Sequence, residues 1–315
     1  MFMFIINILF RLVNPVLASI YKLIEAKLDF LFHFEGIKKS VFAFLVLNLL
    51  SLSSRGQTVT IMTYNIRLDV AVDGENQWSN RKDYFTGQIQ FYEPDIFGIQ
   101  EAMPHQVLDI SQTLGAYAYV GIGREGIGKG ESSNIFYKKE RFKVNQEGTF
   151  WLSETPETVS KGWDAACNRV CTYALMTDIL THKMFWVFNT HLDHMGEMAR
   201  TKGIELILAK MKQLNTKMYP IVLTGDFNSE PTTERIIQLK RVMDDCRSIS
   251  KSKPFGPSGT FNGFKHDHPV TELIDYIFMS KDSFFKVTKY AILSDSKDLK
   301  YPSDHLPVWV QLNYK

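Results

Sequence analysis

The chain has 315 residues, of which 45% are hydrophobic and 22% are charged, so its composition is that of a globular protein and excludes an intrinsically disordered one. The 36 Lys and Arg residues against 34 Asp and Glu give a formal net charge of +2, so affinity for a polyanion would need a local patch. Cys167, Cys171 and Cys246 form no paired metal-ligand cluster and are expected to be unpaired, with a Cys167–Cys171 bridge as the alternative in an exported protein.

Residues 1–57 are predicted to be a leader that is separate from the rest of the chain. Lys38 and Lys39 precede the apolar run VFAFLVLNLL (41–50), and small and polar residues follow it up to Gln57. This order is typical of a secretory signal peptide, and the run is too short for a membrane span of about 20 residues. No A-x-A motif marks a cleavage site. We therefore expect an exported protein, periplasmic or extracellular.

The position of this signal deep in the chain needs an explanation, because signal peptides normally begin at the first residue. We hypothesise that the native chain starts near Ile37 and that residues 1–36 are an upstream extension. The alternative is an N-terminal membrane anchor made of both apolar segments, Met1–Phe10 and Val41–Leu50. In either case the sequence predicts membrane contact only through the leader.

From Thr58 onward, runs rich in β-branched and aromatic residues alternate with helical patterns, and no linker or repeat divides them. The predicted strands are VTIMTYNI (59–66), DIFGIQ (95–100), NIFYK (134–138), YALMTDIL (173–180), MFWVFNT (184–190), PIVLTGD (220–226), LIDYIF (273–278) and LPVWVQL (306–312). The predicted helices, with an apolar period near 3.6, are Lys82–Tyr92, His105–Leu114, Glu197–Leu214 and Thr233–Lys240. Several strands follow one another without a helix, as in 134–151 and 173–190, which disfavours an alternating parallel barrel. We predict one α/β domain, residues 58–315, of two packed mixed β-sheets flanked by helices.

Five polar clusters come at or just past the end of a predicted strand, where a sheet delivers side chains to a common mouth. They contain Asn65 in TYNIR, Glu101 in GIQE, His191 in NTHLD, Asp226 and Asn228 in GDFNSEP, and Asp304 with His305 in SDHLPV. A further acid, Asp275 in LIDYIF, lies inside an apolar run, where a carboxylate is costly unless it is paired. We expect all of these residues to share one site.

Taken together, these motifs resemble the endonuclease/exonuclease/phosphatase superfamily, and they stand in that family's order along the chain. GDFN and SDHLPV are specific even when found alone, and the resemblance covers residues 58–315. It implies the fold of deoxyribonuclease I, a four-layer α/β sandwich, and metal-dependent hydrolysis of phosphate esters. The segment FWLSETPETVSKGWDAACNRVCTYA (150–174) is also similar to a bacterial branch of the superfamily whose members are often exported.

The resemblance implies a metal site formed by Glu101, Asn65 and Asp304. Glu101 is the hard oxygen ligand that suits Mg²⁺, which takes one or two protein carboxylates and keeps most of its waters, and Mn²⁺ is the expected substitute. Asn65 can hold the metal or the phosphate without adding negative charge. Arg67 departs from the pattern of apurinic endonucleases, which carry an acid there next to the metal. We therefore expect a site centred on one metal and no role in abasic-DNA repair.

The resemblance also implies roles in the hydrolytic step. Asp226 would orient and deprotonate the attacking water, and Asn228 and His191 would donate to phosphate oxygens. Asp275 would pair with His305 and fix its tautomer or its charge. No Ser or Cys stands beside a His in these clusters, so we expect direct in-line attack by water without a covalent intermediate.

Several residues near these motifs have a functional and a plain structural interpretation. Arg169 is expected to bind substrate, as a ligand of a second phosphate, while Trp163 would stack on a ring or simply pack. The spacing of His191, Asp193 and His194 suggests zinc, but the sequence shows no third ligand of the zinc type, so His194 is expected to be solvated.

Two loops also carry alternatives. GIGREGIGKG (121–130) contains G-x-G-x-x-G, but a strand follows it instead of a helix, so a dinucleotide loop is rejected in favour of a hairpin turn, with a substrate-side loop as the alternative. Residues 266–268, with the sequence HDH, either line the mouth of the site or form a solvated loop.

These observations predict a Mg²⁺-dependent phosphodiesterase or phosphatase whose partner is a phosphate-ester substrate. A nuclease would need a basic, aromatic strip, and the best candidate, KKERFK (138–143), is short and mixed in charge, so nucleic acid is an alternative that is not favoured over a small ester. The rival of another class is a non-catalytic binding protein on the same scaffold. It predicts loss of Glu101, Asp226 or His305, and all three are present. The sequence indicates no protein partner.

Overall fold

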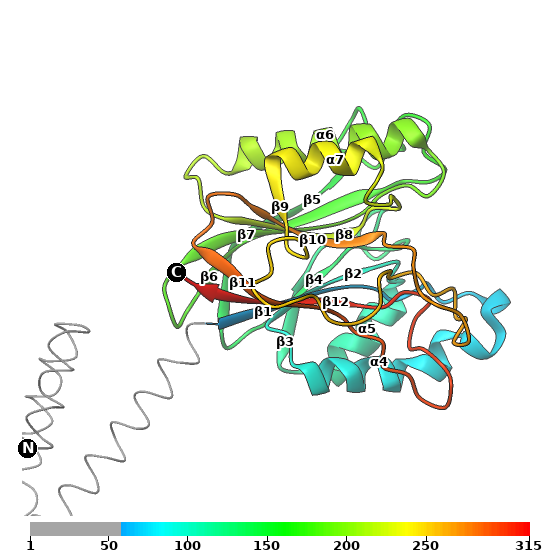
Figure 1. The fold of residues 1–315 in the computed structure, drawn as a ribbon. Helices are drawn as coiled ribbons and strands as arrows, with labels where there is room; N and C mark the ends of the chain where they lie inside the picture. The colour runs from blue at the N-terminus through cyan, green and yellow to red at the C-terminus, as the bar shows by residue number, and fades with distance from the viewer. Residues whose placement is uncertain (1–57) are drawn as a thin grey trace, which may run out of the picture. The chain divides into compact units, whose positions relative to one another are not determined.

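The computed structural model describes residues 58–315 (Figure 1). The predicted leader, with both apolar segments and the proposed start near Ile37, lies outside these residues, so export and anchoring stay predictions. Within the described part, no helix combines the length and the apolar character that a membrane crossing requires.

Two mixed β-sheets of six strands each form the centre of residues 58–315. The first has the order β11 (Phe285–Ile292), β12 (Val308–Tyr314), β1 (Thr58–Asn65), β2 (Ile96–Gln100), β4 (Ile135–Lys138) and β3 (Tyr117–Val120). The second has the order β5 (Phe142–Trp151), β6 (Val170–Asp178), β7 (Met184–His191), β8 (Ile221–Asp226), β10 (Asp275–Ser280) and β9 (Met243–Asp245). β1 pairs with β2 and β7 with β8 in parallel, and the other described neighbours are antiparallel.

Helices cover the outer faces of both sheets (Figure 1). The first sheet is covered by α4 (Trp78–Tyr92) and α5 (Pro104–Thr113), with the short 3-10 helix η1 (Ala71–Asn76) before α4. The second is covered by α6 (Glu197–Leu214) and α7 (Glu234–Val242). The layers are therefore helix, sheet, sheet and helix, and the predicted four-layer α/β sandwich is confirmed.

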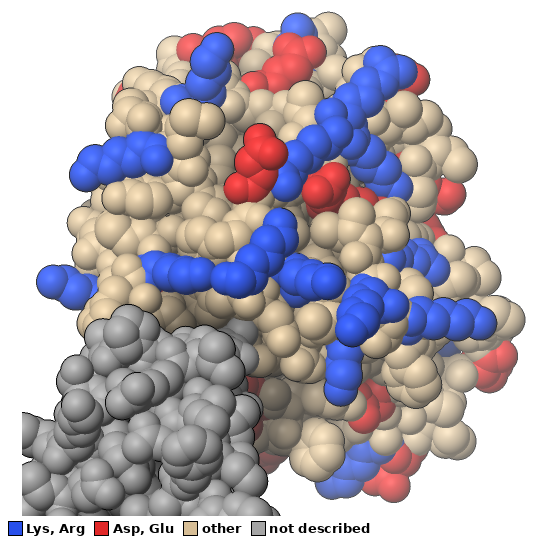
Figure 2. Space-filling view, turned by 60° about the vertical axis from the view of Figure 1, so that its left-hand side comes forward, with Lys and Arg blue, Asp and Glu red and all other residues tan. Residues whose placement is uncertain are grey.

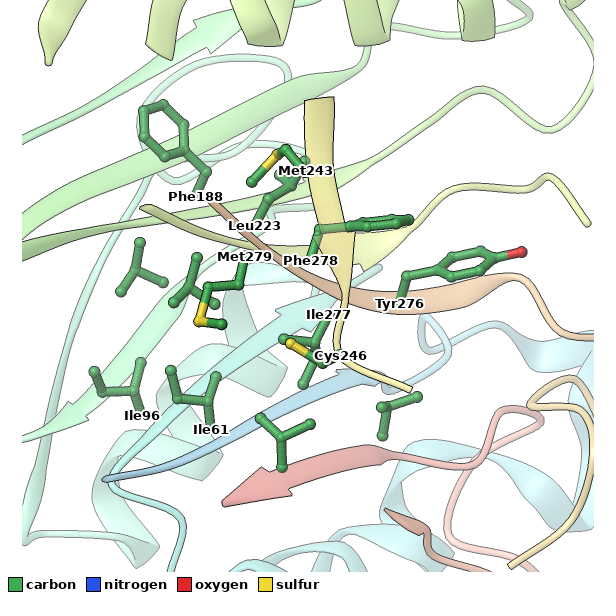
Figure 3. Packing of buried hydrophobic residues seen from close by; sticks show 14 of the residues in the cluster. Ile61, Ile96, Phe188, Leu223, Met243, Cys246, Tyr276, Ile277, Phe278 and Met279 are labelled. Carbon is green, nitrogen blue, oxygen red and sulfur yellow. The ribbon is translucent and has the colours of Figure 1, made fainter. Parts of the chain in front are cut away.

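The main hydrophobic core fills the space between the two sheets (Figure 3). Ile61 and Ile96 of the first sheet face residues of the second, among them Ile277 and Met279. A second buried cluster, which includes Met62, Phe85, Phe97 and Ile110, lies under α4 and α5. β1 is thus covered on both faces, which explains why residues 61–65 are all buried instead of alternating with exposed residues. The ends of such buried strands form a rigid support for polar side chains.

The predicted elements are present, with most ends shifted by no more than three residues. α6 has the predicted bounds, whereas α4 begins four residues earlier than predicted, at Trp78. The predictions placed strands within 134–151 but gave no bounds for β5, and they omitted η1, β3, β9 and β11. β3 and β9 have only four and three residues, too few to show a period. β11 alternates from buried Phe285 through exposed Lys286 to buried Val287, but a register shift between Val287 and Lys289 breaks its period of two.

Candidate active site

The carboxyl ends of four strands meet at one edge of the sandwich. β1 and β2 end side by side, with Asn65 opposite Gln100, and β7 and β8 end with His191 opposite Asp226. Asp275, the first residue of β10, lies opposite Asp226 on its other side. Because parallel strands carry their carboxyl ends to the same edge, residues distant in sequence are brought together here.

These strand ends border a cavity of about 560 Å³, a volume typical of small-molecule sites. Of the predicted site residues, Asn65 and Asp275 lie behind the cavity wall and contact residues that line it. The other predicted residues all line the cavity, and the full lining is Arg67, Leu68, Glu101, Arg124, Glu131, Ala166, Cys167, Arg169, His191, His194, Asp226, Asn228, Phe261, Glu272, Ile274, Asp304 and His305.

The sequence GDFN (225–228) makes a sharp turn where β8 ends. Gly225 approaches β7 so closely that a Cβ atom would lie 2.2 Å from the carbonyl oxygen of Thr190. Phe227 is fully buried, and Asn228 has φ +43°, a left-handed conformation that Asn tolerates. The backbone N–H of Asn228 donates to Asp226 Oδ1 at 2.8 Å. The turn thus fixes Asp226 and Asn228 side by side at the cavity.

The buried side chain of Asn65 connects the two sheets. Its Nδ2 donates to Glu101 Oε1 at 3.0 Å and to Asp226 Oδ2 at 2.9 Å. Glu101 has φ +64°, a conformation that costs energy in a residue other than glycine, and its Oε2 accepts a hydrogen bond from Leu68 N at 3.1 Å. One amide therefore holds an oxygen from each of two carboxylates in place.

His305 stands between two carboxylates. Its Nδ1 lies 2.9 Å from Asp275 Oδ2, and its Nε2 lies 3.8 Å from Asp226 Oδ2. Burial alone would lower the pKa of His305, but the charge and hydrogen bond of Asp275, together with Asp226 and Asp304, raise it well above its ordinary value. Burial, with the charge of Asp275, raises the pKa of Asp226 to about 7. His305 is therefore an imidazolium across the neutral range.

His191 lies on the other side of Asp226, with Nε2 3.5 Å from Asp226 Oδ2. Arg169 NH1 contacts its Nδ1 at 2.9 Å, and because a guanidinium can only donate, the ring proton of neutral His191 is on Nε2. Burial, then the charges of Arg169 and His305, lower the pKa of His191 well below its ordinary value. Nε2 also lies 3.0 Å from Nδ2 of Asn228, which donates to the carbonyl oxygen of Leu192 at 2.9 Å.

Arg67 occupies the side of the cavity next to Asp304. Its guanidinium forms two hydrogen bonds with Asp73, at 2.8 and 2.9 Å, and lies 3.8 Å from Asp304 Oδ2 and 4.0 Å from Glu101 Oε2. The hydrogen bond with Asp73 raises the pKa of Arg67, so its charge is permanent. Asp304, predicted as a metal ligand, is thus partly neutralised by a neighbouring cation.

The donor set fits one hard divalent cation. Oxygens of Glu101 and Asp226 and a ring nitrogen of His191 lie within 4.8 Å of one another. The Nδ1 atom of His191 is taken by Arg169, and Mg²⁺ prefers oxygen, so the two carboxylates, with Asn65 between them, are the stronger ligand candidates. This arrangement adds Asp226 to the predicted set of Glu101, Asn65 and Asp304.

Zinc fits a second cluster poorly. The structure corrects the sequence interpretation that a third zinc-type ligand is absent, because ligand atoms of Cys167, Asp193 and His194 lie within 4.8 Å of one another. However, Arg169 donates to Asp193 Oδ2 at 3.3 Å and to His194 Nδ1 at 2.9 Å, which places a guanidinium beside these ligands. Asp193 Oδ1 accepts three backbone N–H groups before α6. The role of Asp193 is structural. His194 is exposed, but its Nδ1 accepts a hydrogen bond from Arg169.

The cavity lining also contains residues that the sequence interpretation did not assign. Arg124 forms an ion pair with Glu131 at 2.6 Å and donates to Cys167 Sγ at 3.3 Å. Phe261 contributes a partly exposed ring that makes an edge contact with His305, with ring centroids 5.1 Å apart. Arg124 belongs to the glycine-rich loop 121–130, for which a substrate-side role was the open alternative to a simple hairpin.

Other sequence-predicted positions lie away from this cavity. Residues 266–268 are outside its lining, and His266 packs against Tyr301 with centroids 5.0 Å apart. Trp163 is also outside the lining and has φ +49°. All three cysteines are free, and Cys171 and Cys246 are buried.

Comparison with known proteins agrees with this geometry. The sequence profile of the family described as "Endonuclease/Exonuclease/phosphatase family" matches residues 62–305, a span that contains every predicted site residue. Among solved structures, a mannosyl-6-phosphatase of Bacteroides thetaiotaomicron is 36% identical with a TM-score of 0.77, and the match covers 81% of this chain and 100% of that chain.

Two curated relatives match over shorter regions. Uncharacterized protein L388 of Acanthamoeba polyphaga mimivirus is 29% identical over 162 residues, which is 49% of this chain and 60% of that protein. A probable RNA exonuclease of Schizosaccharomyces pombe is 24% identical over 190 residues, which is 55% of this chain and 37% of that protein. This chain spans between 25% and 60% of the length of the first curated relatives.

Proposed function

Since the chain belongs to the endonuclease/exonuclease/phosphatase family, we propose that it is a hydrolase of phosphate esters that uses Mg²⁺ and directly attacking water to cleave a small phosphate monoester. The observation that carries the mechanism is the arrangement of Asp226 between a protonated and a neutral histidine. When bound, the cation would neutralise phosphate oxygens beside Glu101 and Asn65.

Of the two candidate carboxylate ligands, Glu101 is proposed to hold the cation, and Asp226 is proposed to be the base. One of its oxygens is held by Asn228 N and the other by Asn65 Nδ2, so the carboxylate has a fixed orientation toward the cavity. Its pKa of about 7 suits proton transfer near neutral pH. The attacking water would give its proton to Asp226 while the bond from phosphorus to the alcohol oxygen breaks on the opposite side, and the departing oxygen would take a proton from solvent. The charge of His305 stabilises the ionised state of Asp226 before attack.

His191 and Asn228 are proposed to hold the phosphoryl oxygens. His191 Nε2–H and Asn228 Nδ2–H₂ are both donors and lie 3.0 Å apart, so they cannot bond one another. An anionic phosphoryl oxygen in the cavity could accept a hydrogen bond from each of these donors. Both hydrogen bonds would strengthen as negative charge accumulates on that oxygen. Arg169 is proposed to act behind His191 by fixing its tautomer, because its NH1, NH2 and Nε atoms contact His191, His194 and Asp193. This replaces the predicted direct contact of Arg169 with a second phosphate.

A compact alcohol group fits the remaining lining residues of the cavity. Arg124 and Glu131 provide a donor and an acceptor side by side, and Phe261 provides an apolar face, which together suit a polyol such as a sugar. The mannosyl-6-phosphatase relative, which the match covers completely, supports a sugar-phosphate monoester.

A nuclease is the second candidate, because one relative carries the name of an RNA exonuclease. The basic run KKERFK (138–143) does not extend the cavity. It follows β4, which is antiparallel to β2, so it lies at the opposite end of the strand from Glu101. This placement favours the small ester over a polymer.

The proposal is tested with a panel of mannose 6-phosphate, an aryl phosphate monoester, an aryl diester, single-stranded RNA and phospholipids, each assayed with Mg²⁺ and with EDTA. We expect the highest kcat/KM on a sugar monoester and loss of activity in EDTA. His305→Ala should lower kcat by roughly 10³-fold. Lys202→Gln on the exposed face of α6 serves as the control.

Three outcomes would contradict the proposal. A preference for RNA would identify a nuclease, and activity indifferent to EDTA and to His305→Ala would remove the mechanism. Binding of the monoester without turnover under any divalent cation would identify a non-catalytic binding protein.

A further inference from the structure

The end of the sandwich opposite the cavity carries a continuous surface formed by five segments, here called the basic end. They are the turns 138–143, 178–184 and 280–286, the loop 212–221 and the C-terminal residues 314–315. Backbone and side-chain bonds connect these segments: Ile179 N donates to Arg141 O at 2.8 Å and Lys315 N to Phe284 O at 2.7 Å. In addition, Lys183 Nζ donates to Lys315 O at 3.4 Å and Ile221 N to Ser280 Oγ at 3.0 Å.

The basic end is rich in unpaired lysines. Seven of them are exposed: Lys139, Lys143, Lys212, Lys217, Lys281, Lys286 and Lys315. In the described part of the chain none of these seven forms an ion pair, and the exposed acids of the five segments are Glu140 and Asp282 alone. Figure 2 brings this end of the molecule forward and shows Lys and Arg side chains across its middle. A chain with a net charge of only +2 therefore concentrates positive charge at one end.

Apolar side chains project between these lysines. Ile179 and Leu180, at the β6–β7 turn, are 45% and 56% exposed, and Met218, in the loop after α6, is 85% exposed. None of the three is needed to fill the core of the described part. Lysines attract anionic lipid headgroups, and apolar loop tips enter the headgroup region, so this combination is typical of a membrane-surface contact.

The position of the first described residue also agrees with a membrane-surface contact at this end. Thr58, the first described residue, lies at the basic end, because its carbonyl oxygen accepts a hydrogen bond from Arg141 NH2 at 2.6 Å. The described chain therefore begins at the basic end, while Asn65 and the cavity lie at the other end of β1.

We propose that the basic end binds the surface of an anionic phospholipid membrane through its lysines and the tips at Leu180 and Met218. This contact is distinct from the leader and does not depend on the proposed hydrolytic activity. It would direct the cavity toward the aqueous phase, away from the lipid.

The surface is less suited to single-stranded nucleic acid, which needs exposed aromatic faces for stacking. The aromatic residues of these segments are partly covered: Lys183 Nζ lies over the rings of Phe284 and Tyr314, at 4.8 and 4.9 Å from their centroids. Phe284 and Tyr314 also pack against each other, with centroids 5.5 Å apart.

The test uses the protein from Gln57 to Lys315, which removes the apolar segments of the leader. This part has its own core, and the solved Bacteroides phosphatase is matched over its whole length by 81% of the chain, so it folds alone. Co-sedimentation is measured with phosphatidylcholine vesicles, with and without phosphatidylglycerol, at low salt. We compare wild type, Lys143→Gln/Lys281→Gln/Lys286→Gln, Leu180→Ser/Met218→Ser, and the control Lys161→Gln/Lys202→Gln/Lys297→Gln.

We expect wild type to prefer anionic vesicles and the triple lysine variant to lose on the order of 100-fold in partitioning, because each lysine near the surface contributes roughly fivefold. The Leu180/Met218 variant should lose about tenfold on anionic vesicles, and the control should behave like wild type. Equal binding of wild type to both vesicle types would overturn the proposal. So would an equal loss in the control, or a lysine effect on RNA binding without one on vesicles.

Discussion

Two histidines on either side of Asp226 share a similar environment and carry different charge. His191 is 6% exposed and His305 is 4% exposed, and each has a ring nitrogen within 4 Å of Asp226 Oδ2. Yet the pKa of His191 is lowered well below its ordinary value by burial and by Arg169, whereas Asp275 and its neighbours raise that of His305 despite burial.

The difference shows that burial alone does not decide the charge of a histidine. The partner at Nδ1 decides it: a guanidinium on one side of the cavity and a carboxylate on the other. Asp226 therefore has a neutral donor on one side and a cation on the other. The predictions that follow remove, in turn, the carboxylate of Asp226, the carboxylate partner of His305 and the guanidinium partner of His191.

The largest effect is expected for Asp226→Asn, which removes the group that both histidines face. The amide cannot accept the proton of the attacking water, so kcat should fall by on the order of 10³-fold while KM changes little. Steady-state kinetics on the monoester measure this, with Asp282→Asn in an exposed turn as the control. Retention of more than a tenth of wild-type kcat would show that another group is the base.

Asp275→Asn should lower the pKa of His305, so that His305 becomes more like His191 in its charge. Without the carboxylate, burial dominates and the pKa of His305 falls, so its charge is lost at a lower pH. The pKa of Asp226, about 7, should fall too, because the charge of Asp275 contributes to raising it after burial. In wild type, activity should rise with pH through about 7 as Asp226 ionises and fall at alkaline pH as His305 loses its proton.

Both limbs of the pH–kcat profile should therefore move to lower pH in Asp275→Asn, with kcat at pH 8 reduced by roughly 100-fold. The profiles are recorded at several Mg²⁺ concentrations, because a nearby cation itself lowers the pKa of Asp226 and moves the acid limb to lower pH. Unchanged limbs with a uniform loss of kcat would indicate that Asp275 only positions the loop.

A smaller effect is expected for Arg169→Met on the other side. The loss of the guanidinium frees Nδ1 of His191 and raises its pKa, although burial keeps the pKa below its ordinary value. The ring proton is then no longer confined to Nε2, and kcat/KM should fall about tenfold. NMR titration of the ring measures the pKa, and Arg169→Lys should restore part of the activity because it can still donate to Nδ1. A purely structural role would leave the titration unchanged in both variants.

The sequence predicted only some of the residues that give the two histidines different charges. The apolar run LIDYIF indicated that the carboxylate of Asp275 needs a partner, and the resemblance to the family implied that this partner is His305. The strand ends predicted that Asn65, Glu101 and Asp226 lie together. The partner of His191 was not readable. Arg169 comes from an irregular segment, which has no period from which its direction follows.

The same limit applies to Arg124 and Glu131, which reach the cavity from a glycine-rich loop. The predicted alternation of strands and helices contained no information about that loop.

The smallest effect concerns stability and shows what it costs to keep Asp226 between the two rings. Its folded pKa of about 7 lies above the unfolded value of about 3.9, so the unfolded chain ionises first as pH rises and stability falls between these values. Asp226→Asn should therefore match wild type near pH 4 and exceed it at pH 8.

The shift corresponds to about 4 kcal/mol, but the substitution also removes the attraction of Asp226 for His305, so we expect a gain of about 1 kcal/mol, or roughly 2–4 °C in Tm, in EDTA. Thermal unfolding at both pH values measures it. A variant that is less stable than wild type at pH 8 would mean that Asp226 is a necessary partner of the His305 charge, and not a carboxylate held at a cost for catalysis.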